Sequence, residues 1–493
     1  MMLKTAPTLM LSDPTLLRQE NYIDGKWVSA DSGATLTVKN PATGEPVGTV
    51  PAMGAAETRR AIEAAHRAYP AWRALLAGER ASILHKLAAL MLENTEDLAR
   101  IMTAEQGKPL IESRGEIAFA ASFFDWFAEE GKRVYGDTIP QPSKGRRILV
   151  LKEPIGVFAA ITPWNFPSAM ITRKAGAGWA VGCTGVMRPA SQTPFSALAI
   201  AVLAERAGMP PGVCNIITGP SHPIGEELTS NPLVRKLTFT GSTEVGAKLM
   251  AQCAPTIKKV SLELGGNAPF LVFDDADLDA AVQGAMLSKY RNTGQTCVCA
   301  NRILVQDGVY DAFAAKLQAA VAKLKVGNGM EDGVTQGPLI NAAAVQKVEE
   351  HIADAVSRGA KVITGGARHP MGGNFFEPTI LADVPPEAMI FHEETFGPVA
   401  PLFRFQTEEE AIALANNTEF GLAAYFYSRD IGRVFRVAEA LEAGIIGVNE
   451  GIISTVVAPF GGMKSSGLGR EGSKYGIDDY LEIKYVALGG IGT

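Results

Sequence analysis

Several features that mark specialised classes of protein are scarce in this 493-residue sequence. The five cysteines make an odd number spread over a long chain, which predicts no disulfide framework. The six histidines are scattered and fit no ligand spacing, so we expect no bound metal. The net charge is −6, and lysine and arginine form no long run, which argues against a nucleic-acid partner or an anionic membrane partner.

Long apolar runs are also missing, because none reaches the length that crosses a membrane. Residues 1–21 lack the apolar core of a secretory signal and are not arginine-rich like a transit peptide, so we interpret them as a loose leader on a cytoplasmic protein. Apolar residues make up 47% of the chain and charged residues 20%, which is typical of globular domains. The chain is too long for one hydrophobic core, and two or three domains are expected.

The hydrophobic period changes along the chain and separates strands from helices. Residues 21–49 alternate short apolar pieces with Gly-containing turns, which predicts strands and hairpins. From Glu57 the spacing predicts two successive amphipathic helices, and a third is expected over residues 112–134. A Pro/Gly-rich break at 136–143 precedes a strand predicted at 146–152, which has no partner nearby.

From residue 156, apolar runs alternate with helical or Gly/Pro-rich segments, a pattern typical of a parallel sheet with crossover helices. We infer an α/β fold with two successive parallel-sheet domains, joined near residues 265–269. The strands predicted for the two domains lie at 156–161, 213–218, 236–239 and 260–264, and then at 269–273, 302–306, 361–364, 401–405, 423–427 and 445–448.

The Gly-rich C-terminal piece ends in a further strand, predicted at 480–487. This strand could pair with residues 146–152 in a small sheet outside both domains. Because an exposed sheet edge of this kind is usually covered by another subunit, we expect a homo-oligomer.

A polar loop at residues 291–301 contains two of the five cysteines. Cys297 lies among Gly, Thr, Asn and Gln, whereas a structural cysteine usually lies among apolar side chains. A thiol in such a loop could act as a nucleophile if its surroundings help it to ionise, and a packed structural cysteine is the alternative. Cys299 follows two residues later, and no cluster of ligands accompanies the pair that would make a metal site.

Two other stretches could supply a base and a hydrogen-bond donor. Glu263 ends an apolar strand before two glycines, and apolar neighbours would raise its pKa and suit it to general-base catalysis. Asn165 lies in a Pro-Trp-Asn-Phe-Pro loop after a buried strand, where it could donate to a developing oxyanion. The alternatives are a solvated glutamate at a strand end and a rigid turn that only packs.

Phosphate-binding loops need a structural context as well as glycines. The Gly-x-Gly-x-x-Gly string at 467–472 has no core strand before it, so we reject it as a dinucleotide motif. Residues 239–246, Phe-Thr-Gly-Ser-Thr-Glu-Val-Gly, follow a predicted strand and lead into a helix. Their small side chains would let a pyrophosphate approach the helix N-terminus.

Six motifs occur together in one order: Pro-Trp-Asn-Phe-Pro, Phe-Thr-Gly-Ser-Thr-Glu-x-Gly, Leu-Glu-Leu-Gly-Gly, Gly-Gln-x-Cys, Glu-Glu-Thr-Phe-Gly-Pro and Pro-Phe-Gly-Gly-x-Lys-x-Ser-Gly-x-Gly-Arg-Glu. The combination resembles the NAD(P)-dependent aldehyde dehydrogenase superfamily, from residue 20 to residue 487. Within it, residues 170–174, 290–301 and 451–454 are most similar to the succinate-semialdehyde dehydrogenases.

The resemblance implies a thiol mechanism. Cys297 would attack the aldehyde carbonyl, and Asn165 with the Cys297 backbone N–H would bind the oxyanion. Hydride would pass to the nicotinamide and leave a thioester, which Glu263 would hydrolyse by activating water. Cys299 is a possible redox partner of Cys297, because a strained disulfide in so short a loop would be readily reduced.

The resemblance also implies a carboxylate clamp for the substrate. Arg173 and Arg291 match two arginines that bind the distal carboxylate, and Ser454 matches their hydroxyl partner. Ordinary surface ion pairs are the alternative for each arginine. The expected reaction oxidises succinate semialdehyde, a short ω-carboxy aldehyde, to succinate. A glutarate-semialdehyde dehydrogenase is the sibling alternative, because one methylene discriminates weakly. A non-catalytic dinucleotide-binding relative and a thiol hydrolase are the alternatives from other classes.

The resemblance also implies which positions contact the cofactor, and this chain differs from the usual family pattern in two places near them. Arg188 stands where relatives have Lys, and Ser191 stands where NAD-preferring members often have an acid, so we expect NADP to be preferred and NAD to be possible. Trp179 stands where relatives have a smaller residue near the cofactor, and we expect it to affect cofactor affinity. The positions expected to contact the cofactor are Thr162, Trp164, Lys174, Arg188, Ser191, Gly241, Ser242, Glu394 and Phe396.

The domain boundaries follow from the resemblance and the strand pattern together. Residues 1–135 and 153–268 would form a Rossmann-like dinucleotide-binding domain, and residues 269–458 the catalytic domain. Residues 136–152 and 459–493 would form a small β arm that joins subunits into a dimer or tetramer.

Overall fold

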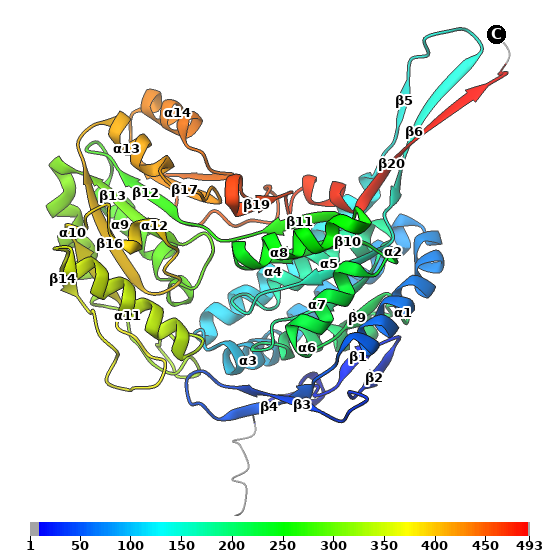
Figure 1. Cartoon of the computed structure of the whole chain (residues 1–493), viewed down its shortest axis with the longest axis horizontal. Helices are drawn as coiled ribbons and strands as arrows, with labels where there is room; N and C mark the ends of the chain where they lie inside the picture. The colour runs from blue at the N-terminus through cyan, green and yellow to red at the C-terminus, as the bar shows by residue number, and fades with distance from the viewer. Residues whose placement is uncertain (1–8, 492–493) are drawn as a thin grey trace, which may run out of the picture.

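The computed structural model describes residues 9–491. Two α/β units lie side by side, and a narrow β arm projects from the first of them (Figure 1). In this part of the chain no helix combines the length and the apolar character that crossing a bilayer requires.

The first unit is built on a sheet of eight strands among the described residues, in the order β19-β11-β10-β7-β8-β9-β1-β2. The five strands from β11 to β9 are parallel, and β19, β1 and β2 extend the edges antiparallel. The strands are β1 (Asn21–Ile23), β2 (Lys26–Val28), β7 (Val157–Ile161), β8 (Thr184–Arg188), β9 (Cys214–Ile216), β10 (Val234–Thr240), β11 (Lys259–Glu263) and β19 (Gly467–Leu468).

Strand β7 lies between β8 and β10, so the chain turns in opposite directions on its two sides. In open α/β sheets, ligands bind beyond the carboxyl ends of the strands at such a switch point. The loops that follow β7 and β10 therefore lie where a ligand is expected.

Helices cover both faces of this sheet. Alternate residues of β7 face opposite ways, as a strand requires: Phe158 and Ala160 join one hydrophobic cluster, and Val157, Ala159 and Ile161 join another. The helices are α1 (Ala55–Ala74), α2 (Ala77–Glu93), α3 (Thr95–Gln106), α4 (Leu110–Glu130), α5 (Ala169–Val181), α6 (Phe195–Ala207), α7 (Ser221–Ser230) and α8 (Thr243–Cys253). A hairpin of β3 (Thr35–Lys39) and β4 (Pro46–Pro51) precedes them.

The second unit has a sheet of seven strands among the described residues, in the order β14-β15-β16-β13-β12-β17-β18, and only its edge strand β14 is antiparallel. Its strands are β12 (Ala268–Val272), β13 (Ala300–Gln306), β14 (Lys361–Thr364), β15 (Thr379–Ala382), β16 (Val399–Phe405), β17 (Ala423–Tyr427) and β18 (Ile445–Val448). Its helices are α9 (Leu278–Lys289), α10 (Asp307–Val321), α11 (Ala342–Ser357), α12 (Met389–His392), α13 (Glu408–Asn416) and α14 (Ile431–Ala440).

The chain passes from the first sheet to the second between Glu263 and Ala268, at the predicted junction. The prediction of two successive α/β domains is confirmed, and so is each strand predicted between residues 156 and 448. Strands β8 and β15 were not predicted.

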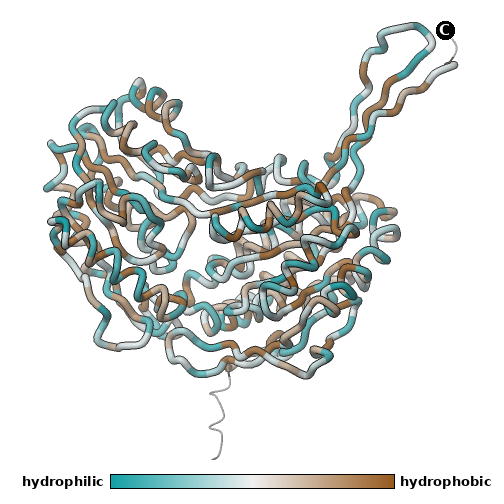
Figure 2. Tube along the Cα trace, in the orientation of Figure 1, coloured by the Kyte–Doolittle hydropathy of each residue, from teal (hydrophilic) through white to brown (hydrophobic). Residues whose placement is uncertain are grey.

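The arm consists of β5 (Asp137–Ile139), β6 (Arg146–Pro154) and β20 (Leu481–Gly489). The predicted pairing of two isolated strands is confirmed, because β6 and β20 pair antiparallel along their whole length. Strand β5 lies in the stretch that was predicted to be a break. The arm carries both hydrophobic and hydrophilic residues (Figure 2), and its Ile483 and Tyr485 side chains are 72% and 63% exposed.

The expectation of a loose leader at residues 1–21 is corrected where the chain is described. Residues 1–8 lie outside the described residues. Further along, the Asp97 carboxylate accepts hydrogen bonds from the backbone N–H groups of Ser12 and Asp13 at 2.9 and 2.7 Å. Leu16 is fully buried in the first unit's core. Residues 12–16 are therefore part of the fold.

Trp179 is accommodated in the core of the first unit. Its ring stacks on Phe124 with centroids 5.8 Å apart, and its indole N–H donates to the Val213 carbonyl at 3.2 Å. The neighbouring Gly178 makes room for the ring of Phe158, because an added Cβ would lie 2.6 Å from that ring. The tryptophan thus fills space among helices, and it lines neither of the cavities described below.

Candidate active site

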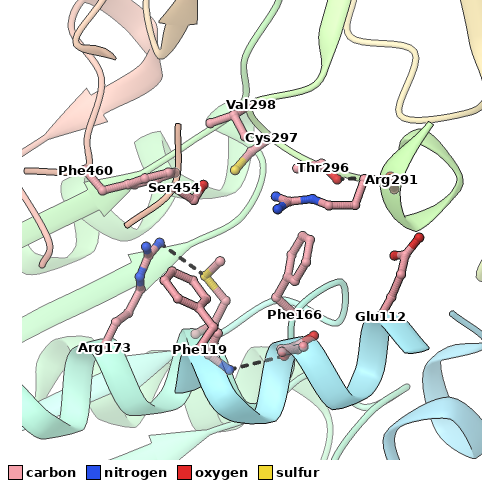
Figure 3. A pocket seen from close by; sticks show the side chains of 14 residues that line it. Glu112, Phe119, Phe166, Arg173, Arg291, Thr296, Cys297, Val298, Ser454 and Phe460 are labelled. Atoms are coloured by element: carbon pink, nitrogen blue, oxygen red, sulfur yellow. Dashed lines mark hydrogen bonds between the residues drawn. The ribbon is translucent and has the colours of Figure 1, made fainter. Parts of the chain in front are cut away.

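Two cavities meet at the side chain of Cys297. The first, of about 320 Å³, is lined by residues of α4, α5 and the loop at 291–298 (Figure 3). The second, of about 270 Å³, lies beyond the carboxyl ends of β7 and β10, at the switch point of the first sheet. Cys297 and Met170 line both cavities. The sulfur can therefore be reached from two sides.

The loop that carries Cys297 is held in an unusual conformation. Asn292, Thr293 and Gly294 are successive left-handed residues with φ of 51°, 57° and 74°. A β-branched residue is strained there, and such strain is concentrated at functional sites. The Gln295 side chain stabilises the turn, because its Nε2 donates to the Asn292 carbonyl at 3.1 Å and its Oε1 accepts from the Ile340 N–H at 2.9 Å.

Opposing charges act on the Cys297 thiol. Burial raises its pKa to about 12, Glu394 and Glu263 add to the increase, and Arg173 and Arg291 oppose it. The thiol is therefore held protonated in the free protein. Neutralising a nearby carboxylate would favour the thiolate.

Asn165 follows β7 and faces the cysteine loop. Its side-chain Nδ2 donates to the Gln295 carbonyl at 3.1 Å, and its own backbone carbonyl accepts hydrogen bonds from Lys108 and Asn292. Asn165 is 97% buried and lines the second cavity beside Cys297. The predicted oxyanion donor and the predicted nucleophile thus share one cavity.

Glu263 ends β11 and is almost fully buried. Burial raises its pKa well above the ordinary value, and Glu471 raises it further, while Lys174 and Arg173 oppose the shift. Neither carboxylate oxygen has a hydrogen-bond partner among the described residues. The apolar surroundings were predicted, but the second carboxylate was not.

The Lys174 side chain contacts Glu471 and does not line the second cavity. Its Nζ donates to the Glu471 carboxylate and to the Thr240 hydroxyl, the latter at 2.7 Å. Burial lowers the pKa of Lys174, and Glu471 opposes that change. Lys174 was predicted as a cofactor contact, and in this structure its ammonium is engaged by Glu471.

The two predicted clamp arginines lie on opposite sides of the first cavity, with Cys297 and Ser454 between them (Figure 3). Arg173 is buried, with its guanidinium carbon 4.3 Å from the centroid of the Phe460 ring and its Nε 3.4 Å from Glu471. Arg291 lies 5.3 Å from the centroid of Phe166. Its guanidinium has no ion-pair partner within residues 9–491, so it is the arginine more available to a bound anion.

Five of the predicted cofactor positions line the second cavity: Trp164, Gly241, Ser242, Glu394 and Phe396. Ser242 caps helix α8 and accepts from the Val245 N–H at 3.4 Å, so the predicted strand–loop–helix at this position is present. Gly265 also lines the cavity, and an added Cβ there would lie 3.3 Å from Glu394 Oε2, a tight contact. Small residues at the start of a helix, beyond the carboxyl ends of parallel strands, are the usual setting for the phosphates of a dinucleotide.

Thr162, Arg188 and Ser191 lie beyond this cavity, at the ends of β7 and β8. Thr162 donates its backbone N–H to the Arg188 carbonyl at 3.2 Å. The Arg188 Nη2 donates to the hydroxyls of Ser191 at 3.1 Å and Ser221 at 2.7 Å. The predicted arginine and serine are therefore brought together, and Ser221 joins them.

Cys299 is buried, with its thiol donating to the Lys289 carbonyl at 3.4 Å. Burial raises its pKa. Cys297 and Cys299 are both free thiols in this structure, and a redox role for Cys299 stays a prediction.

Several charged residues near the site were not predicted. Glu112 and Glu116 on α4 line the first cavity, Lys347 on α11 lines the second, and Glu471 lies between Arg173 and Lys174. Each comes from a segment far from the cysteine loop in sequence. Glu471 ends the last of the six motifs but was given no role, and no local pattern marked the other three residues.

Known proteins share the sequence pattern and the fold of this chain. The sequence matches the model of the aldehyde dehydrogenase family over residues 27–486. The chain belongs to this family.

Among its relatives, the glutarate-semialdehyde dehydrogenase of Pseudomonas aeruginosa is 70% identical over 98% of this chain and 100% of its own length. The NADP(+) succinate-semialdehyde dehydrogenase GabD of Escherichia coli is 67% identical over 98% of this chain and 100% of its own. The crystal structure of succinate-semialdehyde dehydrogenase from Burkholderia pseudomallei is 66% identical and superposes with a TM-score of 0.97, covering 97% of this chain and 99% of that one.

The charge of Glu394 should control the reactivity of Cys297. Burial raises the pKa of Glu394 to about 7, so this carboxylate is ionised above that pH and raises the pKa of the thiol. Glu394→Gln removes the charge, lowers the thiol pKa and increases the thiolate fraction. We expect iodoacetamide to alkylate Cys297 in the variant about two- to tenfold faster than in wild type at about pH 8.5. The difference should shrink at about pH 6, where Glu394 is protonated.

Peptide mapping identifies Cys297 as the alkylated residue in this experiment. Glu393→Gln is the matched control, because Glu393 is the adjacent carboxylate and its exposed side chain lies 3.4 Å from His351. Equal alkylation rates for Glu394→Gln and wild type at both pH values would show that the charge of Glu394 does not affect the pKa of the Cys297 thiol.

Proposed function

We propose that the protein oxidises a short ω-carboxy aldehyde, succinate semialdehyde, to its acid with NADP as hydride acceptor. The observation that carries the proposal is the first cavity, which has the Cys297 sulfur in its wall and two arginine side chains on opposite sides. Such a cavity is complementary to a molecule with an electrophilic carbon at one end and a carboxylate at the other. The names of the relatives support this substrate class.

Three residues perform the proposed steps. The Cys297 thiolate adds to the aldehyde carbon, and Asn165 Nδ2 with the Cys297 backbone N–H binds the oxyanion that forms. The bound nicotinamide supplies the hydride acceptor for this oxidation. Glu263 then takes a proton from the water that hydrolyses the thioester, and its raised pKa makes its carboxylate a stronger base than an ordinary glutamate.

The cofactor preference rests on the group at the ends of β7 and β8. Arg188 is 92% buried, and its Nη2 contacts two hydroxyl groups and no carboxylate among the described residues. A 2′-phosphate would be attracted by this guanidinium and would meet no repelling acid. The NADP(+) in the name of the E. coli relative agrees with this preference, and NAD is the alternative.

The unit containing the eight-stranded sheet, residues 1–135 and 153–268, is proposed to bind the dinucleotide, and residues 269–458 to carry the catalytic thiol. The arm predicted at residues 136–152 and 459–493 is proposed to join subunits through β5, β6 and β20. Strand β19 falls within the second range but belongs to the sheet of the first unit. The exposed Ile483 and Tyr485 support the last assignment, since a partner would cover them.

Glutarate semialdehyde is the second candidate substrate. The 70% identical relative carries that name, and a substrate longer by one methylene would change the binding free energy by only about 1–3 kcal/mol. Comparing kcat/KM for the two semialdehydes, with reduced nicotinamide followed by absorbance, decides between them. Turnover of neither aldehyde with either cofactor would contradict the proposed function.

Arg291 should act on charged substrates only. Arg291→Met removes the free guanidinium, so we expect KM for the preferred semialdehyde to rise about 10- to 100-fold. The rate with butanal, which has no carboxylate, should change less than about threefold. Arg133→Met, which breaks an exposed ion pair with Glu130, is the matched control. An equal loss with both substrates would exclude a clamp.

Ser191 should set the choice between the two cofactors. Ser191→Glu introduces a carboxylate where the serine hydroxyl lies 3.1 Å from Arg188 Nη2. This charge would repel a 2′-phosphate, so kcat/KM for NADP should fall relative to that for NAD by about tenfold or more. Ser191→Ala, which adds no charge, should alter the ratio much less. An unchanged ratio in Ser191→Glu would place the 2′-phosphate elsewhere.

A further inference from the structure

A buried ion pair lies behind the wall of the first cavity. Lys108, in the turn between α3 and α4, has a fully buried side chain, and that of Glu116 on α4 is 2% exposed. The Lys108 Nζ and Glu116 Oε2 are 2.6 Å apart. Such a pair loses the hydration of both charges, so it stabilises a protein poorly unless further hydrogen bonds satisfy it. The further hydrogen bonds of this pair all go to one segment.

That segment is residues 165–169, which contains the predicted oxyanion donor and the start of α5. Lys108 Nζ donates to the backbone carbonyl of Asn165 at 2.6 Å and lies 3.9 Å from the centroid of the Phe166 ring. The second oxygen of Glu116 accepts from the backbone N–H groups of Ser168 at 3.0 Å and Ala169 at 3.2 Å. The ammonium and the carboxylate therefore bind the two ends of the segment.

The same carbonyl is bound from the other side by the cysteine loop. Asn292 Nδ2 donates to the Asn165 carbonyl at 3.1 Å and to the Gln295 carbonyl at 3.1 Å. The Asn165 side chain donates to the Gln295 carbonyl as well. Asn165 is thus fixed between Lys108 on one side and the loop carrying Cys297 on the other.

The electrostatics of the pair agree with this arrangement. Burial lowers the pKa of Lys108, and the charge of Glu116 opposes that change and favours the ammonium. Glu116 also lines the first cavity, where an uncompensated carboxylate would repel an anionic substrate. Lys108 balances this charge.

We propose that Lys108 and Glu116 are positioning residues, which hold the 165–169 segment so that the Asn165 amide is aligned with the carbonyl attacked by Cys297. The inference rests on the oxyanion role given to Asn165 under the proposed function. A displacement of about 1 Å at a reacting group can cost on the order of 100-fold in rate. Disrupting the pair should therefore slow acylation without weakening cofactor binding.

The test is the burst of reduced cofactor in the first turnover of the full-length protein with NADP and succinate semialdehyde. Lys108→Met and Glu116→Gln should each lower the burst rate about 10- to 100-fold. The KM for NADP and the alkylation rate of Cys297 should stay within about twofold of wild type. Glu116→Gln keeps the size of the side chain, so it tests the contribution of the ion pair to the burst rate if Lys108→Met fails to fold.

A double-mutant cycle shows whether Lys108 acts through Asn165. In an Asn165→Ala background, Lys108→Met should lower the burst rate less than about twofold further, because the group it positions is gone. A merely structural role would give additive losses. Arg114→Met is the matched control. Arg114 lies on the same helix as Glu116 and forms an exposed ion pair with Glu96. The burst rate of this variant should match that of wild type.

The outcomes separate this inference from the proposed function. A normal burst in Asn165→Ala would overturn the oxyanion role and the inference with it. A slow Asn165→Ala together with normal bursts in Lys108→Met and Glu116→Gln would overturn the inference alone. Additive losses in the cycle would also overturn it.

Discussion

The close packing of the cysteine loop against the connection between the two sheets is the constraint on which the site depends. The chain leaves β11 at Glu263 and enters β12 at Ala268, and Gly266 lies between them. A Cβ on Gly266 would stand 2.4 Å from the Cys297 carbonyl oxygen. One backbone thus passes directly beneath the other. This contact places the thiol of the second unit at the switch point of the first.

The site keeps its charges buried and balanced. Glu471 lies between Lys174 and Arg173, Glu116 pairs with Lys108, and Arg291 is left without a carboxylate partner in the described chain. Arg291 is half-buried and lines the first cavity, so its guanidinium is available to pair with a bound anion. Burial raises the pKa of the Cys297 thiol and keeps it protonated, and Glu394 and Glu263 add to this effect while the two arginines oppose it.

Sequence patterns were sufficient where the chemistry is local. Apolar runs bounded by glycine and proline located the strands from β9 to β18 except β15, and small polar residues located the loops after β7 and β10 and the loop of Cys297. Strand β8 was missed because Thr184–Arg188 mixes Gly, Thr and Arg, although all five residues are buried. Glu471 lay in a motif but its role was missed, and Lys108 and Glu116 were missed altogether, because the groups that they bind at Lys174 and at residues 165–169 lie far away in sequence. Lys174 fitted a motif, but its ammonium is engaged by Glu471.

A covalent acyl group on Cys297 is the most direct measure of the proposed chemistry. Glu263→Gln removes the base for hydrolysis and leaves the thiol and both cavities in place. After mixing this variant with NADP and succinate semialdehyde and quenching in acid, mass spectrometry should find a succinyl group on the peptide that contains Cys297, and none when NADP is omitted. An unmodified Cys297 in a variant that still reduces one equivalent of NADP would contradict a thioester on this residue.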